Sequence, residues 1–224
     1  LYSLACTLPR GGDSLIDAFK LKLKDFDVPI FTDTEITKIV SNNSREIKAL
    51  KSKNNDYFEC SNCISTIHPQ VLINILPSRF VRPVFIKRIK EYSNTVSPFV
   101  IFLNLKKIPD CLYNSNYLVN DKSISDSKIG FLTPGSGAEF QTGFSAIKYC
   151  SRKDINPFFT ENHSEIEDME KSKLTNIFKY VFPDIDFNVI ETVTPKTYEK
   201  YTGTVSGSMF GIKQSVNQHL TGIK

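Results

Sequence analysis

The sequence predicts an α+β fold, with a mixed, largely antiparallel sheet of about seven strands covered by helices. The composition of the 224 residues, 40% hydrophobic and 23% charged, is that of a globular protein and excludes a disordered chain or a collagen. Some segments place apolar residues at helical spacing, whereas others alternate or form short apolar runs. No apolar run approaches the roughly 20 residues that a membrane helix needs. These observations favour helices packed on a sheet that carries one meander extension.

The first third of the chain predicts one helix followed by short strands. After a Pro-Arg-Gly-Gly turn, a residue at 13 or 14 can cap a helix whose apolar residues recur at helical spacing until about residues 25–27. A short apolar run and a three-stranded meander with polar turns follow. The predicted strands are 28–32, 35–41, 47–51 and 56–65.

The rest of the chain begins with two helices, 69–76 and 78–92, which carry proline at a tolerated first-turn position. A long strand with an apolar centre is predicted over 95–105, and the Asn/Ser-rich residues 106–127 predict a loop. A glycine-rich turn is expected at 134–137. The remaining predicted elements are strands 128–133 and 144–151, helix 164–182, strand 187–194, helical turn 195–201 and loop 203–211.

Charge and cysteine content narrow the class of protein. With 28 Lys+Arg against 24 Asp+Glu, the net charge of +4 predicts no nucleic-acid partner. The five cysteines are an odd and scattered set, which favours reduced thiols and a cytoplasmic location. Cys60-Ser-Asn-Cys63 is a lone CxxC without the two further ligands that zinc needs, so no metal site is predicted.

Motifs alone identify no reaction. The sequence contains no GxSxG, no GxxxxGK[ST] and no HExxH, and no pair of carboxylates stands out as catalytic. The glycine-rich run 203–211 is open to two interpretations, a phosphate-binding loop or a tight loop that needs positive φ angles.

Four stretches, spread over nearly the whole chain, match one ordered set of motifs. They are Leu8-Pro-Arg-Gly-Gly-Asp-Ser-Leu-Ile-Asp-Ala-Phe19 with 28–30 and 34–39; Ile64-Ser-Thr-Ile-His-Pro69; Asn94-Thr-Val-Ser-Pro-Phe-Val-Ile-Phe-Leu103; and Thr194-Pro-Lys-Thr-Tyr-Glu-Lys-Tyr-Thr-Gly203 with Gly207-Ser-Met-Phe-Gly211. Together they resemble the flavin-dependent phytoene desaturase and retinol saturase family, within the flavin amine oxidase group. The retinol saturase side fits better, although Lys200 and Phe210 stand where that family usually has arginine and tyrosine.

The resemblance implies that the chain is the middle of an FAD-dependent oxidoreductase that saturates or desaturates C–C bonds of a polyene or isoprenoid lipid. The family's GxGxxG would precede Leu1 and its last flavin motif would follow Lys224, so this piece alone is expected to be inactive. The implied division is 1–68 in the FAD-binding domain, 69–194 as the substrate domain and 195–224 as a return segment. An apolar lipid is the implied substrate, and NAD(P)H is the candidate electron donor.

The resemblance also implies site residues. Ile36 matches the position whose backbone pairs with the adenine edge, and Ser65 and Thr66 would lie near the adenosine and pyrophosphate. The residues implied near the flavin or the substrate cavity are Gly11, Gly12, Tyr201, Thr202, Gly203, Gly207 and Gly211. Each of these residues also has an explanation that needs no cofactor. Ile36 can be a core strand residue, Ser65 and Thr66 can lie at a strand end, and the glycines can serve turn geometry alone. No catalytic residue is assigned, because His68 beside a helix start is more often an ordinary histidine and flavin itself carries the hydride chemistry.

Residues 79–90 combine five basic residues with interleaved apolar ones. One interpretation is a packed helix with a solvated face. The other is a helix that lies on a membrane surface, which would make the protein a peripheral membrane protein. The alternative function that follows is a non-catalytic lipid-binding or membrane-docking domain.

Overall fold

The computed structural model describes residues 12–106, 116–120, 122, 127–132 and 143–214, and it confirms the α+β class. Its contacts divide the chain into two compact units. We call Leu1–Pro29 with Val96–Thr197 the five-strand unit, and Ile30–Thr95 with Tyr198–Lys224 the three-strand unit. The predicted division at 68/69 and 194/195, which assigns segments to a cofactor domain and a substrate domain, stays a prediction.

The three-strand unit contains the predicted meander. Its strands are antiparallel in the order β1 (Ile36–Ser41), β2 (Ile47–Ser52) and β3 (Tyr57–Glu59). The turns between them each hold a polar residue at positive φ, Arg45 in the first and Asn55 in the second. Asparagine tolerates this conformation well, which explains the tight turn between β2 and β3.

Two helices follow the meander and form a small core with the end of the chain's described part. They are α2 (Pro69–Ile75) and α3 (Pro83–Glu91), with a 3₁₀ turn at Ser78–Phe80 between them. Proline opens both helices, at the position where its missing N–H costs no hydrogen bond. The buried residues of this core are Ile73, Ile89, Tyr92 and Ile212, with Phe85 and Ile86 packed against them.

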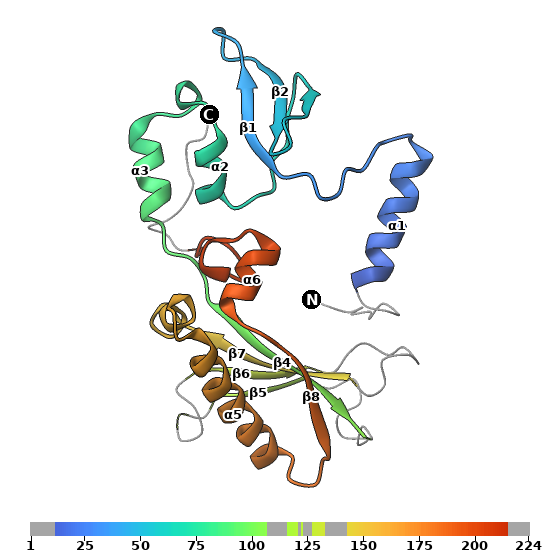
Figure 1. Ribbon diagram of the computed structural model, residues 1–224, viewed down its shortest axis with the longest axis vertical. Helices are drawn as coiled ribbons and strands as arrows, with labels where there is room; N and C mark the ends of the chain where they lie inside the picture. The colour runs from blue at the N-terminus through green and yellow to red at the C-terminus, as the bar shows by residue number, and fades with distance from the viewer. Residues whose placement is uncertain (1–11, 107–115, 121, 123–126, 133–142, 215–224) are drawn as a thin grey trace, which may run out of the picture. The chain divides into compact units, whose positions relative to one another are not determined.

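The five-strand unit is one antiparallel sheet with helices. The strand order is β5-β6-β7-β4-β8, so β4 pairs with β7 on one side and β8 on the other. In Figure 1, α5 lies over one face of this sheet. The strands are β4 (Ser97–Leu105), β5 (Asn116–Val119), β6 (Ile129–Leu132), β7 (Gly143–Cys150) and β8 (Phe187–Val193). The helices are α1 (Gly12–Asp25), α4 (Arg152–Ile155), α5 (His163–Val181) and α6 (Pro195–Thr202). From Tyr198 on, the residues of α6 belong to the three-strand unit.

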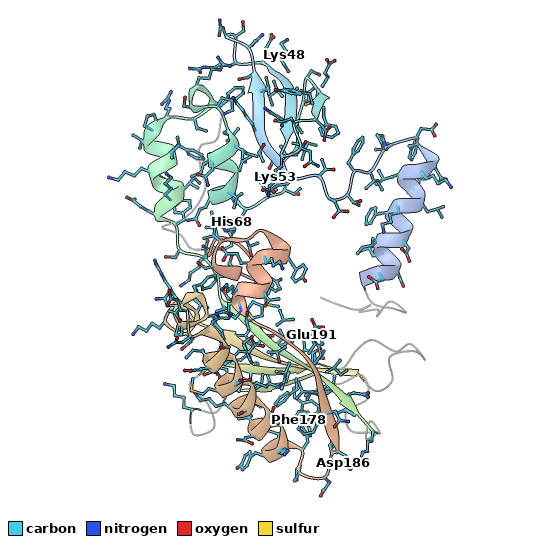
Figure 2. All side chains as sticks on the ribbon, viewed as in Figure 1. Lys48, Lys53, His68, Phe178, Asp186 and Glu191 are labelled. Atoms are coloured by element: carbon cyan, nitrogen blue, oxygen red, sulfur yellow. The ribbon has the colours of Figure 1, made fainter. Side chains whose placement is uncertain are left out.

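Phenylalanine fills the core between α5 and the sheet. Phe178 of α5 is fully buried, and its ring centroid lies 5.5 Å from that of Phe131 and 5.4 Å from that of Phe144. Phe182 and Phe187 complete the cluster, at 5.1 Å and 4.9 Å from Phe178. The edge-to-face geometry of most of these pairs is the one that aromatic rings favour. Phe178 lies between α5 and the sheet in Figure 2.

Four predicted elements differ from the structure. Residues 28–32 are not a strand but exposed coil, and the strand expected over 56–65 is only Tyr57–Glu59. The loop expected over 106–127 contains β5, a short edge strand paired only with β6 among the described strands. The helix expected over 78–92 begins at Pro83, because a proline can start a helix but cannot continue one. The expected turn at 134–137 lies outside the described residues.

Among the helices that the structure describes, none is long and apolar enough to cross a membrane.

Candidate functional site

Three of the four stretches that carry the family resemblance meet inside the three-strand unit. Their meeting point, which we call the His68 cluster, consists of His68, Gln70, Asn94, Thr95 and Gly211. His68 comes just before α2, Asn94 and Thr95 follow α3, and Gly211 lies in the C-terminal loop (residues 203–213). The position of His68 is labelled in Figure 2.

His68 uses both ring nitrogens. Its Nδ1 accepts a hydrogen bond from the backbone N–H of Gln70 at 3.2 Å, which caps α2. Since Nδ1 is an acceptor, the proton of the neutral ring is on Nε2, which donates to Oδ1 of Asn94 at 3.2 Å. The side chain is 7% exposed. Burial lowers the pKa of His68, and the hydrogen bond to Asn94 opposes this shift.

Two amide side chains continue the network from His68 to the end of α3. Asn94 Nδ2 donates to Oε1 of Gln70 at 3.2 Å. Gln70 Nε2 in turn donates to the carbonyl oxygens of Ile89 at 2.9 Å and Tyr92 at 3.0 Å. The carbonyl of Ile89 also accepts the backbone N–H of Tyr92, so Gln70 adds further hydrogen bonds at the C-terminal end of α3, where carbonyls lack partners within the helix. The start of α2 is thereby joined to the end of α3.

The C-terminal loop is held at the same place by backbone hydrogen bonds. Thr95 donates from its backbone N–H and from Oγ1 to the carbonyl oxygen of Gly211, at 2.9 Å and 3.1 Å. Phe210 N–H donates to Oγ1 of Thr95, and Lys213 N–H donates to the carbonyl of Ser93. Asn94 forms an antiparallel bridge with Ile212. A stretch more than 100 residues distant in sequence therefore pairs with residues 93–95.

The glycines of the C-terminal loop have positive φ angles. The values are 66° for Gly203, 63° for Gly207 and 70° for Gly211. The neighbouring Ser206, also at positive φ, donates its backbone N–H to Oε1 of Glu199 at 3.0 Å. Turn geometry alone accounts for the three glycines. Their place beside a flavin stays a prediction.

Replacing Gly211 with alanine is expected to destabilise the protein by about 1–2 kcal/mol, the usual cost of a left-handed conformation for a residue with a Cβ. A Cβ at Gly211 would lie 3.7 Å from Cδ2 of His68, which is ordinary contact, so the cost is conformational and not steric. Gly211→Asn is expected to cost less, because asparagine tolerates this conformation.

Urea unfolding of each variant measures this effect. Gly12→Ala is the matched control, since Gly12 begins α1 and a Cβ there meets nothing within 4 Å. Equal unfolding free energies for Gly211→Ala and Gly12→Ala would contradict the expected strain.

The other predicted cofactor residues are separate from the His68 cluster. Ile36 is half-buried at the start of β1, and Ser65 and Thr66 are exposed in the coil between β3 and α2. Gly12 belongs to the five-strand unit, while Gly11 lies outside the described residues.

In the flavin-side set, Tyr201 is 79% exposed, and Thr202 is also exposed, with its Oγ1 donating to the carbonyl of Tyr198. Sequence reasoning missed Gln70 and Asn94 as members of a cluster. Their one signal was position, beside the His-Pro pair and at the head of the third stretch.

Helix α3 packs by its apolar side and leaves its basic residues exposed. Ile89 is buried in the core of the three-strand unit, whereas Lys87, Arg88 and Lys90 are exposed. Arg79, which precedes α3, donates to the carbonyl oxygen of Ser41. The packed-helix interpretation accounts for these positions, and a membrane contact of residues 79–90 stays a prediction.

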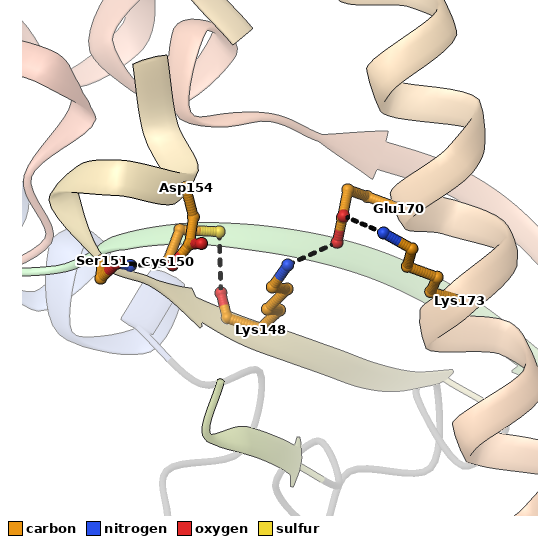
Figure 3. Close-up of polar contacts among 6 residues, drawn as sticks. All are labelled: Lys148, Cys150, Ser151, Asp154, Glu170 and Lys173. Carbon is orange, nitrogen blue, oxygen red and sulfur yellow. Dashed lines mark hydrogen bonds and ion pairs between the residues drawn. The ribbon is translucent and has the colours of Figure 1, made fainter. Parts of the chain in front are cut away.

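The five-strand unit contains a separate buried polar cluster, shown in Figure 3. Glu170 of α5 accepts from Lys148 of β7 at 2.5 Å and from Lys173 at 3.0 Å. Cys150 lies two residues further along β7 and is buried, which raises the pKa of its thiol to about 12. A thiol with this pKa is not a nucleophile at neutral pH.

Comparison with known proteins shows the fold. No protein-family model and no curated protein sequence match the chain. An oxidoreductase from Methanosarcina mazei is similar in structure, with a TM-score of 0.65, 13% identity, and coverage of 83% of this chain and 42% of that one. A protein from Pyrococcus furiosus has a TM-score of 0.57, 13% identity, and coverage of 83% and 43%. The chain thus shares its fold with an oxidoreductase and spans about two fifths of the length of these solved structures.

Proposed function

We propose that the chain is the middle part of an FAD-dependent oxidoreductase that saturates or desaturates C–C bonds of a polyene or isoprenoid lipid, similar to retinol saturase and phytoene desaturase. The observation that carries this proposal is the His68 cluster. Three stretches that resemble motifs of one enzyme family, at residues 64–69, 94–103 and 207–211, meet there through described hydrogen bonds. The fold shared with an oxidoreductase over most of the chain supports the same proposal.

The edge strand β1 is suited to the predicted adenine contact. Among the described strands, only β2 pairs with β1, so β1 lies at the edge of its sheet. An edge strand presents backbone N–H and C=O groups that no neighbouring strand uses. Ile36, at the start of β1, would offer these groups to the adenine of FAD whatever its side chain. FAD would supply the hydride chemistry, and the protein would bind and orient the cofactor and the lipid.

The 224-residue chain by itself is expected to be colourless and to retain no FAD. It contains no GxGxxG, the glycine-rich turn that places a helix N-terminus against the pyrophosphate of a dinucleotide. Adenine contacts alone are too few to offset the entropy lost on association. The measurement is flavin absorbance after gel filtration. The chain is compared with the same chain extended by its genomic flanking sequence.

Turnover is tested with the extended protein. Its FAD should be reduced or reoxidised when an all-trans polyene alcohol or a carotenoid precursor is added without oxygen, and chromatography should show a product that differs by two hydrogens. An extended protein that binds no FAD would overturn the proposal. Bound FAD that reacts with a small amine but with no polyene would leave an oxidoreductase and overturn the lipid substrate.

A further inference from the structure

We propose that neutral His68 is a positioning residue that holds the C-terminal loop beside α2 and α3, and that protonation of His68 in mild acid releases this loop. The inference concerns the three-strand unit by itself and does not depend on the proposed function. It rests on the way both ring nitrogens of His68 are used.

The neutral ring is the only form that satisfies both partners. Nδ1 faces the backbone N–H of Gln70, which can only donate, and Nε2 faces Oδ1 of Asn94, which can only accept. Protonation would place a second N–H on the ring, directly opposite the N–H of Gln70. The cap of α2 would then be lost, and two donors would face each other in a site that is almost closed to water.

The effect reaches the C-terminal loop through Asn94. The side chain of Asn94 is oriented by His68 at Oδ1 and by Gln70 at Nδ2. The backbone of Asn94 bridges Ile212, and the next residue, Thr95, bonds Gly211. A tilt of His68 away from Gln70 would therefore disturb the pairing of residues 93–95 with residues 210–213.

Few charges surround His68 in the part of the chain that the structure describes. Helix α2 carries no charged residue, and the charged residues of the neighbouring elements, Lys90 and Glu91 of α3 and Lys213 of the C-terminal loop, are exposed. Among the described residues, Tyr92 of the same core is also titratable, and it is buried and carries no positive charge. Burial is thus the main cause that lowers the pKa of His68 below its ordinary value of 6.5.

The sign of the pH effect follows from this shift. Because the folded state binds the proton less readily than the unfolded state, the contribution of His68 to stability is complete above about pH 6.5 and declines as the pH falls below that value. The opened loop, in which His68 meets water, gains population over the same range.

Hydrogen exchange of the intact protein tests the proposal. The amides of Thr95, Phe210 and Lys213 should exchange about tenfold faster near pH 5 than near pH 7, after correction for intrinsic exchange and relative to core amides of β4. In His68→Asn the side chain can still cap α2 but cannot titrate, so the exchange of these amides should show no such pH dependence. The control His163→Gln should behave as the unmodified protein. Persistent acid acceleration in His68→Asn would overturn the proposal.

A second variant introduces a negative charge at position 94. In Asn94→Asp a carboxylate faces Nε2 and stabilises the charged ring, so the pH at which His68 titrates by NMR should rise by about one unit or more. A titration midpoint that does not move would mean that His68 and residue 94 are not coupled. If Asn94→Asp does not fold, the comparison of His68→Asn with His163→Gln still decides the question.

Discussion

Replacing Phe178 with alanine is expected to lower the free energy of unfolding by about 3–5 kcal/mol, the range observed when a buried aromatic side chain is truncated in a core. Phe178 is fully buried on α5 and contacts four other rings: Phe131, Phe144, Phe182 and Phe187. The cavity cannot close by an inward movement of β6, β7 and the start of β8 together. The long antiparallel ladder between β4 and β7 keeps the strands of the sheet in place. Most of the cavity is therefore expected to remain.

Chemical denaturation of Phe178→Ala and Tyr180→Ala separates this effect from a change in helix propensity. Tyr180 is on the same helix and is 72% exposed, so its truncation should change the unfolding free energy by less than about 0.5 kcal/mol. Equal losses for the two variants would show that α5 does not pack on the sheet as described. Phe178→Leu should lie between them, because it keeps much of the buried volume.

The same packing explains which elements were predictable from sequence. Helix α5 was predicted over 164–182 and spans His163–Val181, and strand β4 was predicted over 95–105 and spans Ser97–Leu105. Both are long and carry their own signal, helical spacing in one and an apolar centre in the other. Their apolar residues enter one core, so local pattern and tertiary contacts favour the same structure.

The errors occurred where local pattern and tertiary context disagree. Residues 28–32 are apolar enough for a strand but have no described strand partner, and Phe31 instead packs its ring against Phe58 at 4.9 Å. Strand β5 is only four residues long, and its polar flanks indicate a loop. Residues 116–119 form a strand because they pair with β6, and this pairing cannot be recognised from the local sequence.

The candidate site shows the same limit. The sequence suggested an ordinary histidine at a helix start, and His68 does cap α2. The contacts from His68 to Asn94 and from Thr95 to Gly211 join residues 26 and 116 positions apart. Periodicity cannot reveal such pairs. The ordered motifs indicated that these stretches belong to one kind of protein, but not that their side chains meet.

Removing the carboxylate of Glu170 is expected to be as damaging as removing Phe178. Glu170→Ala would leave the ammonium of Lys148, whose side chain is 15% exposed, without its buried partner, and breaking a buried pair in this way costs about 3–5 kcal/mol. Replacing both residues, as Lys148→Met with Glu170→Leu, should recover most of the loss, since no charge is then left buried. Lys173→Ala is the matched control, because Lys173 is half-exposed and its pair with Glu170 is worth under about 1 kcal/mol.

The pH dependence of unfolding distinguishes this charge effect from lost packing. Burial alone would raise the pKa of Glu170, but the hydrogen bonds and the positive charges of Lys148 and Lys173 together outweigh it and lower the pKa below the ordinary value of 4.5. The contribution of Glu170 is therefore complete above about pH 4.5 and is lost as the pH falls below that value. Thermal melting of the unmodified protein should lose stability in this acid range, whereas Glu170→Gln should start lower and lose less. A Glu170→Ala protein as stable as Lys173→Ala would show that the buried pair in Figure 3 contributes nothing to the fold.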